Sequence, residues 1–426
     1  MGTMNAQQYH RRVVDADLDL LLNDLSAISL DGPKGVGKTE TALQRVTRIL
    51  RLDRSTDREL LAARPELLHT IPPPILLDEW QQWPEVWDLV RRAVDEGASS
   101  GSYLLTGSAT PTAQIHTGAG RIVPLRIRPM TLAERGVGRP TVSLAGLLRG
   151  TAAIEGETDV RLEDYVEEIL RSGFPGIRTA KTGRGLRAQL DGYLDRLFDH
   201  EVVENGSMQR RPAAMRQWLT AYAAATATSA TYETIRDAAT PGQSDKPSKV
   251  TALGYRDVLQ RLWILDALDA WSPTRNQLAR LTAAPKHHLA DPALAARLLS
   301  LTTDSLIGGE TRSRARDRSM LGPLFESLVT LSVRVFAQSA EARVGHLRTQ
   351  AGRHEIDLIV TGESGRVLAL EVKLSGSPSS TDAQHLHWLR DEIGDDLIDA
   401  VIVTAGPHAY RRKDGIAVIP AALLGP

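Results

Sequence analysis

The chain has 426 residues, of which 42% are hydrophobic and 24% are charged, and its formal net charge is −1. This length predicts about three domains, each large enough to bury a core, with the composition of ordinary globular proteins. The absence of cysteine excludes disulfide bonds and thiolate metal sites, and the balanced charge excludes a polycation that binds nucleic acid over its whole surface.

Signals for membrane insertion or secretion are absent from the sequence. No apolar run approaches the ~18 residues that a membrane-spanning helix needs, and the first residues lack the apolar stretch of a signal peptide. We therefore expect a cytoplasmic protein with no membrane partner.

A phosphate-binding loop is predicted at residues 32–39, where the sequence matches G-x-x-x-x-G-K-[ST] at every fixed position. Glycines let backbone N–H groups wrap around phosphate, Lys38 neutralises the β- and γ-phosphates, and the Thr39 hydroxyl reaches Mg²⁺. A short buried strand at 27–30 leads in, and a helix at 41–46 leads out with its N-terminal dipole favouring phosphate. We expect ATP and Mg²⁺ as cofactors. The predicted nucleotide-binding residues of the loop are Gly32, Pro33, Lys34, Gly35, Val36, Gly37, Lys38 and Thr39.

An acidic strand end is predicted to face the same ligand. Residues 74–79 form a short apolar run that ends in Asp78 and Glu79, and parallel strands direct their carboxyl ends toward the ligand. Asp78, with Thr39, can hold Mg²⁺, and Glu79 can orient and deprotonate the attacking water. Since the acids follow a phosphate-binding loop, they predict a catalytic site rather than incidental surface charge.

Another buried strand, at 103–106, ends in small hydroxyl residues. Thr106 or Ser108 is placed to sense the γ-phosphate or the attacking water by a hydrogen bond, although a plain strand and turn fits equally well. Arg121 follows in a predicted loop. It can stabilise transition-state charge, in cis or from a neighbouring subunit, or it can be an ordinary exposed arginine.

These motifs stand in the order 32–39, 78–81, 104–108 and 120–121. In that order they resemble the AAA-type ATPases of bacteria and archaea, in particular the branch that carries a C-terminal domain of unknown function, DUF4143. The family typically has Asp-Glu-Ile-Gln at the acidic strand, where Trp80 here replaces isoleucine. It also has a Pro-Leu-Ser-Phe type of segment where residues 128–132 read Arg-Pro-Met-Thr-Leu. These departures leave the predicted catalytic positions intact.

The resemblance implies an α/β fold in several parts. A P-loop NTPase domain of the AAA type, with a parallel sheet, is expected over residues 1–140, followed by a helical lid and connector over 141–205. A winged-helix-like domain over 206–300 and an α/β nuclease-like domain over 301–426 complete the predicted order.

The predicted lid consists of helices at 163–170 and 185–198, separated by a turn at 172–175. Basic residues gather around this turn. They favour a solvated face over a phosphate site, and they are Arg171, Arg178, Lys181, Arg184 and Arg187.

A winged helix is suggested by a helix at 232–239, a turn, a longer helix from Ser248 to 262, and a strand at 263–268 that could begin a wing. The expected DNA contacts are Lys249, Thr251 and Arg256, with Arg275 on the wing. Because acidic residues are interspersed, a protein-interaction module remains an alternative.

Paired histidines at 287 and 288 precede Asp291 and Pro292. Adjacent residues of a strand point to opposite sides, so we interpret His287 and His288 as structural rather than as metal ligands. Pro292 is expected at the first position of a helix.

A second acidic group is predicted in the last third of the chain. Asp357 lies on one apolar strand, and Glu371 and Lys373 share a face of the next, so a hairpin brings two carboxylates for Mg²⁺ beside a lysine. Glu326, on a preceding helix, could add a third acid. The pattern resembles the PD-(D/E)-x-K nucleases. A charged surface hairpin, or a nuclease fold that no longer cuts, are the alternatives.

We therefore predict an ATP-binding protein, a Mg²⁺-dependent ATPase coupled to a DNA-binding or nuclease-like C-terminal module. The alternative is a nucleotide-switched protein-interaction module with little turnover. ATP is the expected ligand, DNA or a protein is the expected partner, and oligomerisation is left open. The alternating arginines at 312, 314, 316 and 318 favour a solvated face over a nucleic-acid site.

Overall fold

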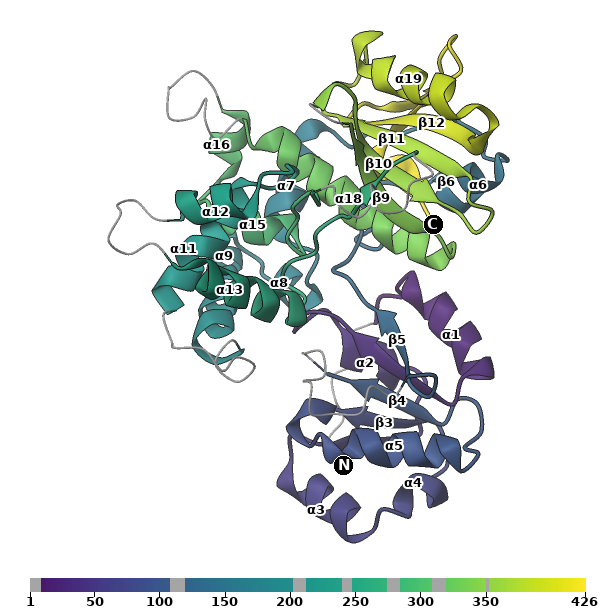
Figure 1. The fold of residues 1–426 in the computed structure, drawn as a ribbon, viewed down its shortest axis with the longest axis vertical. Coiled ribbons are helices and arrows are strands. Elements are labelled where there is room, and N and C mark those ends of the chain that lie inside the picture. Colours follow the sequence, from purple (N-terminus) through teal and green to yellow (C-terminus); the bar gives the residue numbers. More distant parts are fainter. Residues whose placement is uncertain are drawn as a thin grey trace. The chain divides into compact units, whose positions relative to one another are not determined.

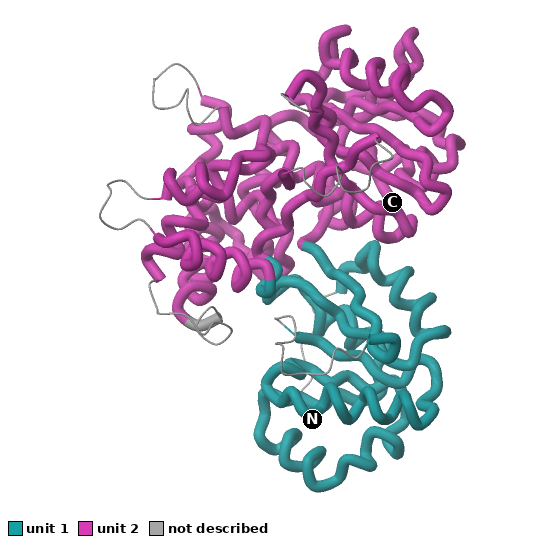
Figure 2. Tube along the Cα trace, viewed as in Figure 1, with its two compact units in different colours: residues 1–128, 261–263 teal, residues 129–260, 264–426 magenta. Residues whose placement is uncertain are grey.

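The computed structural model describes residues 9–107, 119–201, 212–239, 247–273, 284–308, 319–349 and 352–426. The chain divides into two compact units, shown in different colours in Figure 2. The first unit comprises residues 1–128 and 261–263, and the second comprises residues 129–260 and 264–426. Each has its own sheet and its own hydrophobic core.

The first unit is built on a parallel sheet, which in the described residues has five strands in the order β2-β3-β4-β1-β5. Its strands are β1 (Ala27–Asp31), β2 (Arg48–Arg51), β3 (Ile75–Asp78), β4 (Tyr103–Thr106) and β5 (Val123–Arg126). Its helices are α1 (Val14–Asp24), α2 (Lys38–Leu43), α3 (Ser55–Ala63), α4 (Leu67–Thr70), the 3₁₀ turn η1 (Trp80–Gln82) and α5 (Glu85–Asp95). The α/β fold with a parallel sheet is thus confirmed.

The central strands of this sheet are buried on both faces, which is why their sequences read as continuous apolar runs. One face packs against α3, α4 and α5 through residues such as Leu61, Leu68 and Val90 (Figure 1). All strand pairs are parallel, so every strand points its carboxyl end to the same edge. The loop after β1 and the acids after β3 therefore lie at one edge of the sheet.

The second unit contains a larger sheet, which in the described residues has eight strands in the order β7-β13-β14-β12-β11-β10-β9-β8. Its strands are β7 (Gly156–Glu157), β8 (Ala270–Trp271), β9 (Arg343–Arg348), β10 (Glu355–Thr361), β11 (Val367–Lys373), β12 (Leu397–Thr404), β13 (His408–Arg411) and β14 (Ala417–Pro420). A separate parallel pair is formed by β6 (Val142–Ser143) and β15 (Leu424–Gly425).

The larger sheet is covered on one face by α19 (Gln384–Ile393), whose Leu386 and Leu389 join its apolar core. The long helix α18 (Leu321–Ser339) contacts β9, β10 and β11 (Figure 1). Residues 142–157, including α6 (Leu144–Arg149), pair and pack with the C-terminal strands. They belong spatially with this sheet, although they lie far from its C-terminal strands in sequence. Short 3₁₀ turns complete this part: η5 (Thr381–Ala383), η6 (Gly394–Asp396) and η7 (Ala421–Leu423).

Helices form the remainder of the second unit: α7 (Leu162–Arg171), α8 (Pro175–Arg178), α9 (Gly183–Arg196), the π-helical segment η2 (Leu197–Glu201), α11 (Pro212–Ala224), α12 (Tyr232–Ala238), α13 (Lys249–Arg261), α15 (Pro292–Leu298) and α16 (Thr303–Ile307). The central one is α15, which contacts α7, α9, α11 and α18. Its residues 292–296 are all buried, as expected for a helix that is apolar on every side.

The turn between α7 and α8 is fixed by a buried charge network. Gly173 accepts a hydrogen bond from Met130 N and donates one to Asp291, and a Cβ there would lie 2.6 Å from an Arg135 nitrogen. The fully buried Arg135 guanidinium lies 3.2 Å from Glu168 and 3.9 Å from Asp291. The glycine is required because arginine and backbone occupy the space of a side chain.

Two helices are present where the winged helix was predicted, but the strand predicted to begin its wing is not formed in the described residues. Helix α13 begins after Ser248, whose Oγ accepts a hydrogen bond from Thr251 N. The predicted strand at 263–268 is reduced to isolated antiparallel bridges, Leu265 with Leu289 and Leu268 with Lys286. Arg275 lies outside the described residues. Within the described ranges, no helix has both the length and the apolar character to cross a bilayer.

Candidate functional site

The predicted phosphate loop connects β1 to α2. Its first residue, Gly32, has a φ of 153°, and a Cβ there would lie 2.2 Å from the Ile127 carbonyl oxygen at the end of β5. Gly37 precedes α2 with a φ of 104°, a left-handed conformation that favours glycine. The loop thus passes so close to neighbouring backbone that no larger residue fits at its start.

Lys38 lies inside this loop and is almost completely buried. Its Nζ donates hydrogen bonds to the carbonyl oxygens of Gly32 at 2.7 Å and Pro33 at 3.0 Å. Burial lowers the pKa of Lys38 to about 8, against the opposing effect of the Glu79 and Asp31 carboxylates. A buried cation whose hydrogen bonds go to neutral carbonyl oxygens of the loop is suited to receive an anion.

Asp78 joins the loop to the next two strands. Its Oδ1 accepts a hydrogen bond from Thr39 Oγ1 at 2.8 Å and another from Thr106 Oγ1 at 2.5 Å. This convergence follows from the strand order, because β4 lies between β1 and β3 and pairs Thr106 with both Leu30 and Asp78. The structure therefore brings Lys38, Thr39, Asp78 and Thr106 to one strand edge, as their sequence positions predicted.

Glu79 follows directly, with a left-handed backbone φ of 54°. Its Oε2 accepts a hydrogen bond from Gln81 Nε2 at 2.5 Å. The intervening Trp80 is buried against Trp87, with ring centroids 4.7 Å apart. The sequence motif contained Gln81, but no role for it was predicted, because its contact with Glu79 depends on the bend at that residue.

The loop is also supported by residues just before α1 that the sequence reading missed. Arg12 donates to the Val36 carbonyl oxygen at 3.1 Å, and its backbone N donates to Asp15. Asp15 in turn forms an ion pair of 2.8 Å with Arg45, which follows α2. These charged residues anchor α1 against the loop and the helix after it. No local motif marks them in the sequence, because their partners are distant.

Arg121 is not brought to this edge within the chain. It precedes β5, so it lies at the amino-terminal edge of the parallel sheet, and it pairs with Asp95 of α5 at 2.8 Å. The prediction of a role for Arg121 in cis therefore has no support from its position, because the phosphate loop lies at the opposite edge. Ser108, the alternative to Thr106, lies outside the described residues.

The predicted DNA contacts on α13 have partners within the chain. Lys249 forms an ion pair with Glu233, Thr251 shares a hydrogen bond with Ser248, and the Arg256 guanidinium lies over the Tyr232 ring. The paired histidines are buried, and His287 Nε2 lies 2.7 Å from the Ala230 carbonyl oxygen. Burial lowers the pKa of both histidines, which supports the structural interpretation.

The second acidic group does assemble in the second unit. Asp357 on β10 lies beside Glu371 and Lys373 on β11, in an antiparallel register that pairs Leu358 with Leu370. Glu326 of α18 reaches the same group. The sequence reading missed Lys286, whose Nζ lies 2.8 Å from Glu326 Oε1 and 3.0 Å from Asp357 Oδ1. No local pattern marks this lysine, since its partners are 40 and 71 residues away.

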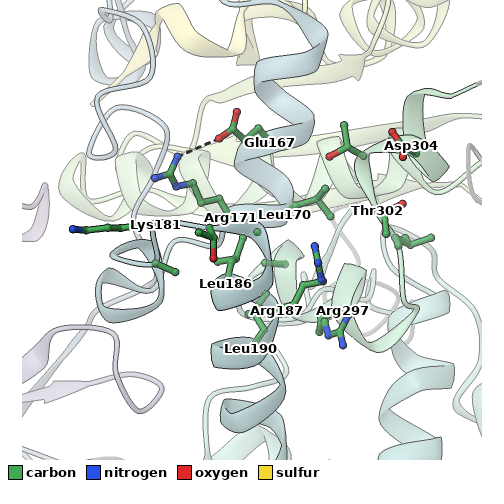
Figure 3. A pocket seen from close by; sticks show the side chains of 16 residues that line it. Glu167, Leu170, Arg171, Lys181, Leu186, Arg187, Leu190, Arg297, Thr302 and Asp304 are labelled. Atoms are coloured by element: carbon green, nitrogen blue, oxygen red, sulfur yellow. Dashed lines mark hydrogen bonds and ion pairs between the residues drawn. The ribbon is translucent and has the colours of Figure 1, made fainter.

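The second unit also contains a cavity of about 760 Å³ beside α7 and the start of α9. Figure 3 shows Arg171, Lys181, Arg187 and Arg297 among the side chains around it. Arg171 is paired with Glu167 at 3.1 Å, drawn as a dashed line, and Arg297 is paired with Asp191. The cavity contains none of the nucleotide-site residues.

Three segments of the chain match protein-family models. Residues 25–135 match an AAA domain, residues 162–305 match the domain of unknown function DUF8612, and residues 321–424 match the domain of unknown function DUF4143. The resemblance to AAA-type ATP-binding proteins with a C-terminal DUF4143 domain is confirmed. The AAA match, which includes all the residues gathered around Lys38 and Asp78, implies nucleotide binding by the first unit.

Relatives and solved structures extend the comparison. The uncharacterized proteins Rv2008c of Mycobacterium tuberculosis and Mb2031c of Mycobacterium bovis are each 25% identical over 422 residues, 96% of this chain and 83% of theirs. The Walker-type ATPase PABY2304 of Pyrococcus abyssi is 18% identical with a TM-score of 0.42, over 70% of this chain and 97% of that one. The protein VC1899 from Vibrio cholerae is 13% identical with a TM-score of 0.20, over 93% of this chain and 94% of that one. Both TM-scores are low, so the assignment of the first unit rests on the family match.

Proposed function

We propose that the first unit binds Mg·ATP in the loop between β1 and α2 and hydrolyses it. The observation that carries this proposal is the pair of hydrogen bonds to Asp78, from Thr39 at 2.8 Å and Thr106 at 2.5 Å. They join the phosphate loop, the acidic strand and the strand between them into one polar group at the carboxyl edge of the sheet. Ligands of open parallel sheets bind at this edge.

Binding is assigned to the loop and Lys38. The Lys38 ammonium now donates to two carbonyl oxygens of the loop, which are weaker acceptors than phosphate oxygens. Exchange of these partners for the β- and γ-phosphates satisfies a buried cation and neutralises the anion. The hydroxyl of Thr39 and the carboxylate of Asp78 are oxygen donors of the kind that Mg²⁺ prefers, and they are the residues that would hold it. Mg²⁺, when bound, neutralises charge on the phosphates.

Hydrolysis is assigned to Glu79, which directly follows Asp78 at the strand end. Its carboxylate can accept a proton from the attacking water, the general-base role that is typically worth about 10²–10⁴ in rate. Thr106 positions the Asp78 carboxylate through its 2.5 Å hydrogen bond. A contribution from Arg121 is proposed only from a neighbouring copy, because within the chain it pairs with Asp95.

The assignment is tested by titrating the full-length protein with a fluorescent ATP analogue and Mg²⁺. Lys38→Ala should weaken binding about 100-fold, since the principal phosphate-binding charge is lost. Glu79→Gln should leave affinity within about twofold, because that residue acts on water and not on the nucleotide. Unchanged affinity in a folded Lys38→Ala protein would place the nucleotide elsewhere.

Three observations favour a second candidate, a nucleotide-switched protein-interaction module with little turnover. The Glu79 carboxylate is already bonded by Gln81, and the expected DNA-contacting residues of α13 have partners within the chain. On the same helix the side chains of Val250 and Leu253 are exposed, at 75% and 47%. Exposed apolar residues on a helix suit a protein partner better than a phosphate backbone.

The two candidates are separated by following phosphate release from Mg·ATP with and without double-stranded DNA. Stimulation by DNA supports an ATPase coupled to a DNA-acting C-terminal module. Slow release with tight retention of nucleotide, unaffected by DNA, supports the switch. A Val250→Ser, Leu253→Ser protein serves as the companion variant, because it changes the exposed apolar pair and leaves the nucleotide site intact.

A further inference from the structure

Lys286 is a buried cation at the centre of the acidic group in the second unit. Its backbone is fixed by reciprocal hydrogen bonds with Leu268, and its side chain is 1% exposed. The Nζ atom lies 2.8 Å from Glu326 Oε1, 3.0 Å from Asp357 Oδ1 and 3.5 Å from Glu355 Oε1. A single ammonium therefore contacts carboxylates from α18 and β10 together.

Other carboxylate oxygens of this acidic group also accept hydrogen bonds. Asp357 Oδ2 accepts a hydrogen bond from Val372 N at 2.9 Å, and Glu371 Oε2 accepts one from Lys373 Nζ at 3.1 Å. Glu371 Oε1 is buried without a hydrogen-bond partner among the described residues. A divalent cation needs several oxygen ligands that converge on one point, and here that point is next to an ammonium group.

The positive charge of Lys286 is held firmly. Burial alone would lower its pKa, but Asp357 and Glu326 outweigh burial and raise the pKa above its usual value. Burial also works to raise the pKa of Asp357, yet Lys286 and Lys373 lower it to about 2. Because Lys286 Nζ lies within hydrogen-bond distance of both Glu326 and Asp357, a Mg²⁺ ion bound by these carboxylates would have to displace this ammonium group.

We propose that Lys286 takes the place of the divalent cation in this nuclease-like group, so that the carboxylates are neutralised internally and do not bind Mg²⁺. The residues predicted as a second Mg²⁺ site are brought together, but they do not fit the ion. Within the described residues, no group of three or more histidine, aspartate and glutamate side chains is arranged to hold a metal. This inference is independent of the nucleotide site.

Lys286 is then the residue that keeps these carboxylates as a salt-bridged cluster and prevents them from forming a cation site. Replacing it by methionine, which has a similar length and no charge, leaves Glu326, Asp357 and Glu355 without their shared cation. A bound divalent ion would then supply the neutralising positive charge that the buried carboxylates lose with the ammonium group. We expect the Lys286→Met protein to bind one more divalent ion than the wild type.

The test uses Mn²⁺ as the probe, with bound and free ion measured by electron paramagnetic resonance on nucleotide-free, full-length protein. Wild type, Glu371→Gln and Asp357→Asn should bind the same number of ions. Lys286→Met should bind one more, and Lys286→Met with Asp357→Asn should lose it. Lys413→Met, an exposed lysine on the same unit, controls for the change in net charge.

Loss of one bound Mn²⁺ in Glu371→Gln or Asp357→Asn relative to wild type would overturn the inference. A folded Lys286→Met protein with no additional ion would overturn it as well. Circular dichroism establishes whether each variant folds. Since Glu371→Gln leaves the Lys286 ion pairs intact, its comparison with wild type decides the matter even if the other variants do not fold.

Discussion

Lys38 connects the burial of one side chain to the pH range over which the protein binds nucleotide. Burial lowers its pKa to about 8 in the nucleotide-free protein, whereas bound phosphates raise the pKa of a neighbouring ammonium. At pH 7 and below the lysine is almost fully charged, so binding takes up almost no proton. Above pH 8 a proton must be bound together with the nucleotide, and affinity must fall.

We predict that the dissociation constant for Mg·ATP rises by about twofold between pH 7 and 8 and then more steeply, approaching tenfold per pH unit. Fluorescence titration with an ATP analogue between pH 7 and 10 measures it. Lys38→Arg is the control, because arginine stays charged over this range. An equal pH dependence in Lys38→Arg would assign the effect to another group.

Gln81 holds the carboxylate that is proposed to act on water. Its Nε2 donates to Glu79 Oε2 at 2.5 Å, and this bond must lengthen or break before Glu79 can accept a proton. We predict that Gln81→Ala raises the rate of phosphate release about tenfold, the equivalent of one charge-assisted hydrogen bond. A fall in the rate would show instead that Gln81 positions Glu79 productively.

At the scale of elements, the buried network around Arg135 is predicted to set the stability of the second unit. Its side chain is 0% exposed and pairs with Glu168 at 3.2 Å, which also pairs with Arg178 at 2.7 Å. Removal of Arg135 leaves the buried Asp291 carboxyl without its ion-pair partner and Glu168 with Arg178 alone, a loss of roughly 3–5 kcal/mol. We expect Arg135→Met to lower the free energy of unfolding by that amount in urea titrations.

Arg171→Met is the matched control, since Arg171 pairs with Glu167 on the surface of α7. Exposed pairs of this kind contribute about 0–1 kcal/mol. Equal losses in the two variants would contradict the importance of the buried network.

The sequence predicted the elements whose chemistry is local. The loop at 32–39 and the acids at 78 and 79 are short motifs beside buried strands, and the order of the strands then brings them together. The contacts that were missed join residues far apart in sequence, such as Lys286 with Asp357 and Arg12 with Val36. No periodic pattern in a single sequence indicates which distant residues come into contact.

Arg121 shows where local sequence does not decide between alternatives. Its position after a strand and a glycine suggested an active-site loop, but parallel strands begin and end at opposite edges, and Arg121 precedes its strand. Residues 142–157 were expected in the connector, yet they pair with strands near the C-terminus. The two-residue strands involved are too short to give a pattern in the sequence.

At the scale of the whole molecule, two kinds of charged site are combined in one chain. The first unit has a buried lysine that bonds backbone carbonyls and is proposed to exchange them for phosphates. The second unit has a buried lysine whose carboxylate partners are already in place. We therefore propose nucleotide chemistry in the first unit and predict that the acidic group of the second unit contributes no metal-dependent step.

The first unit is proposed to hydrolyse Mg·ATP with Glu79 as the general base. The most direct test of this role is the steady-state rate of phosphate release at saturating Mg·ATP by full-length wild type, Glu79→Gln and Glu85→Gln, the last an exposed glutamate at the start of α5. We predict that Glu79→Gln lowers the rate about 100-fold or more, while Glu85→Gln retains it. Wild-type turnover by Glu79→Gln would contradict the account.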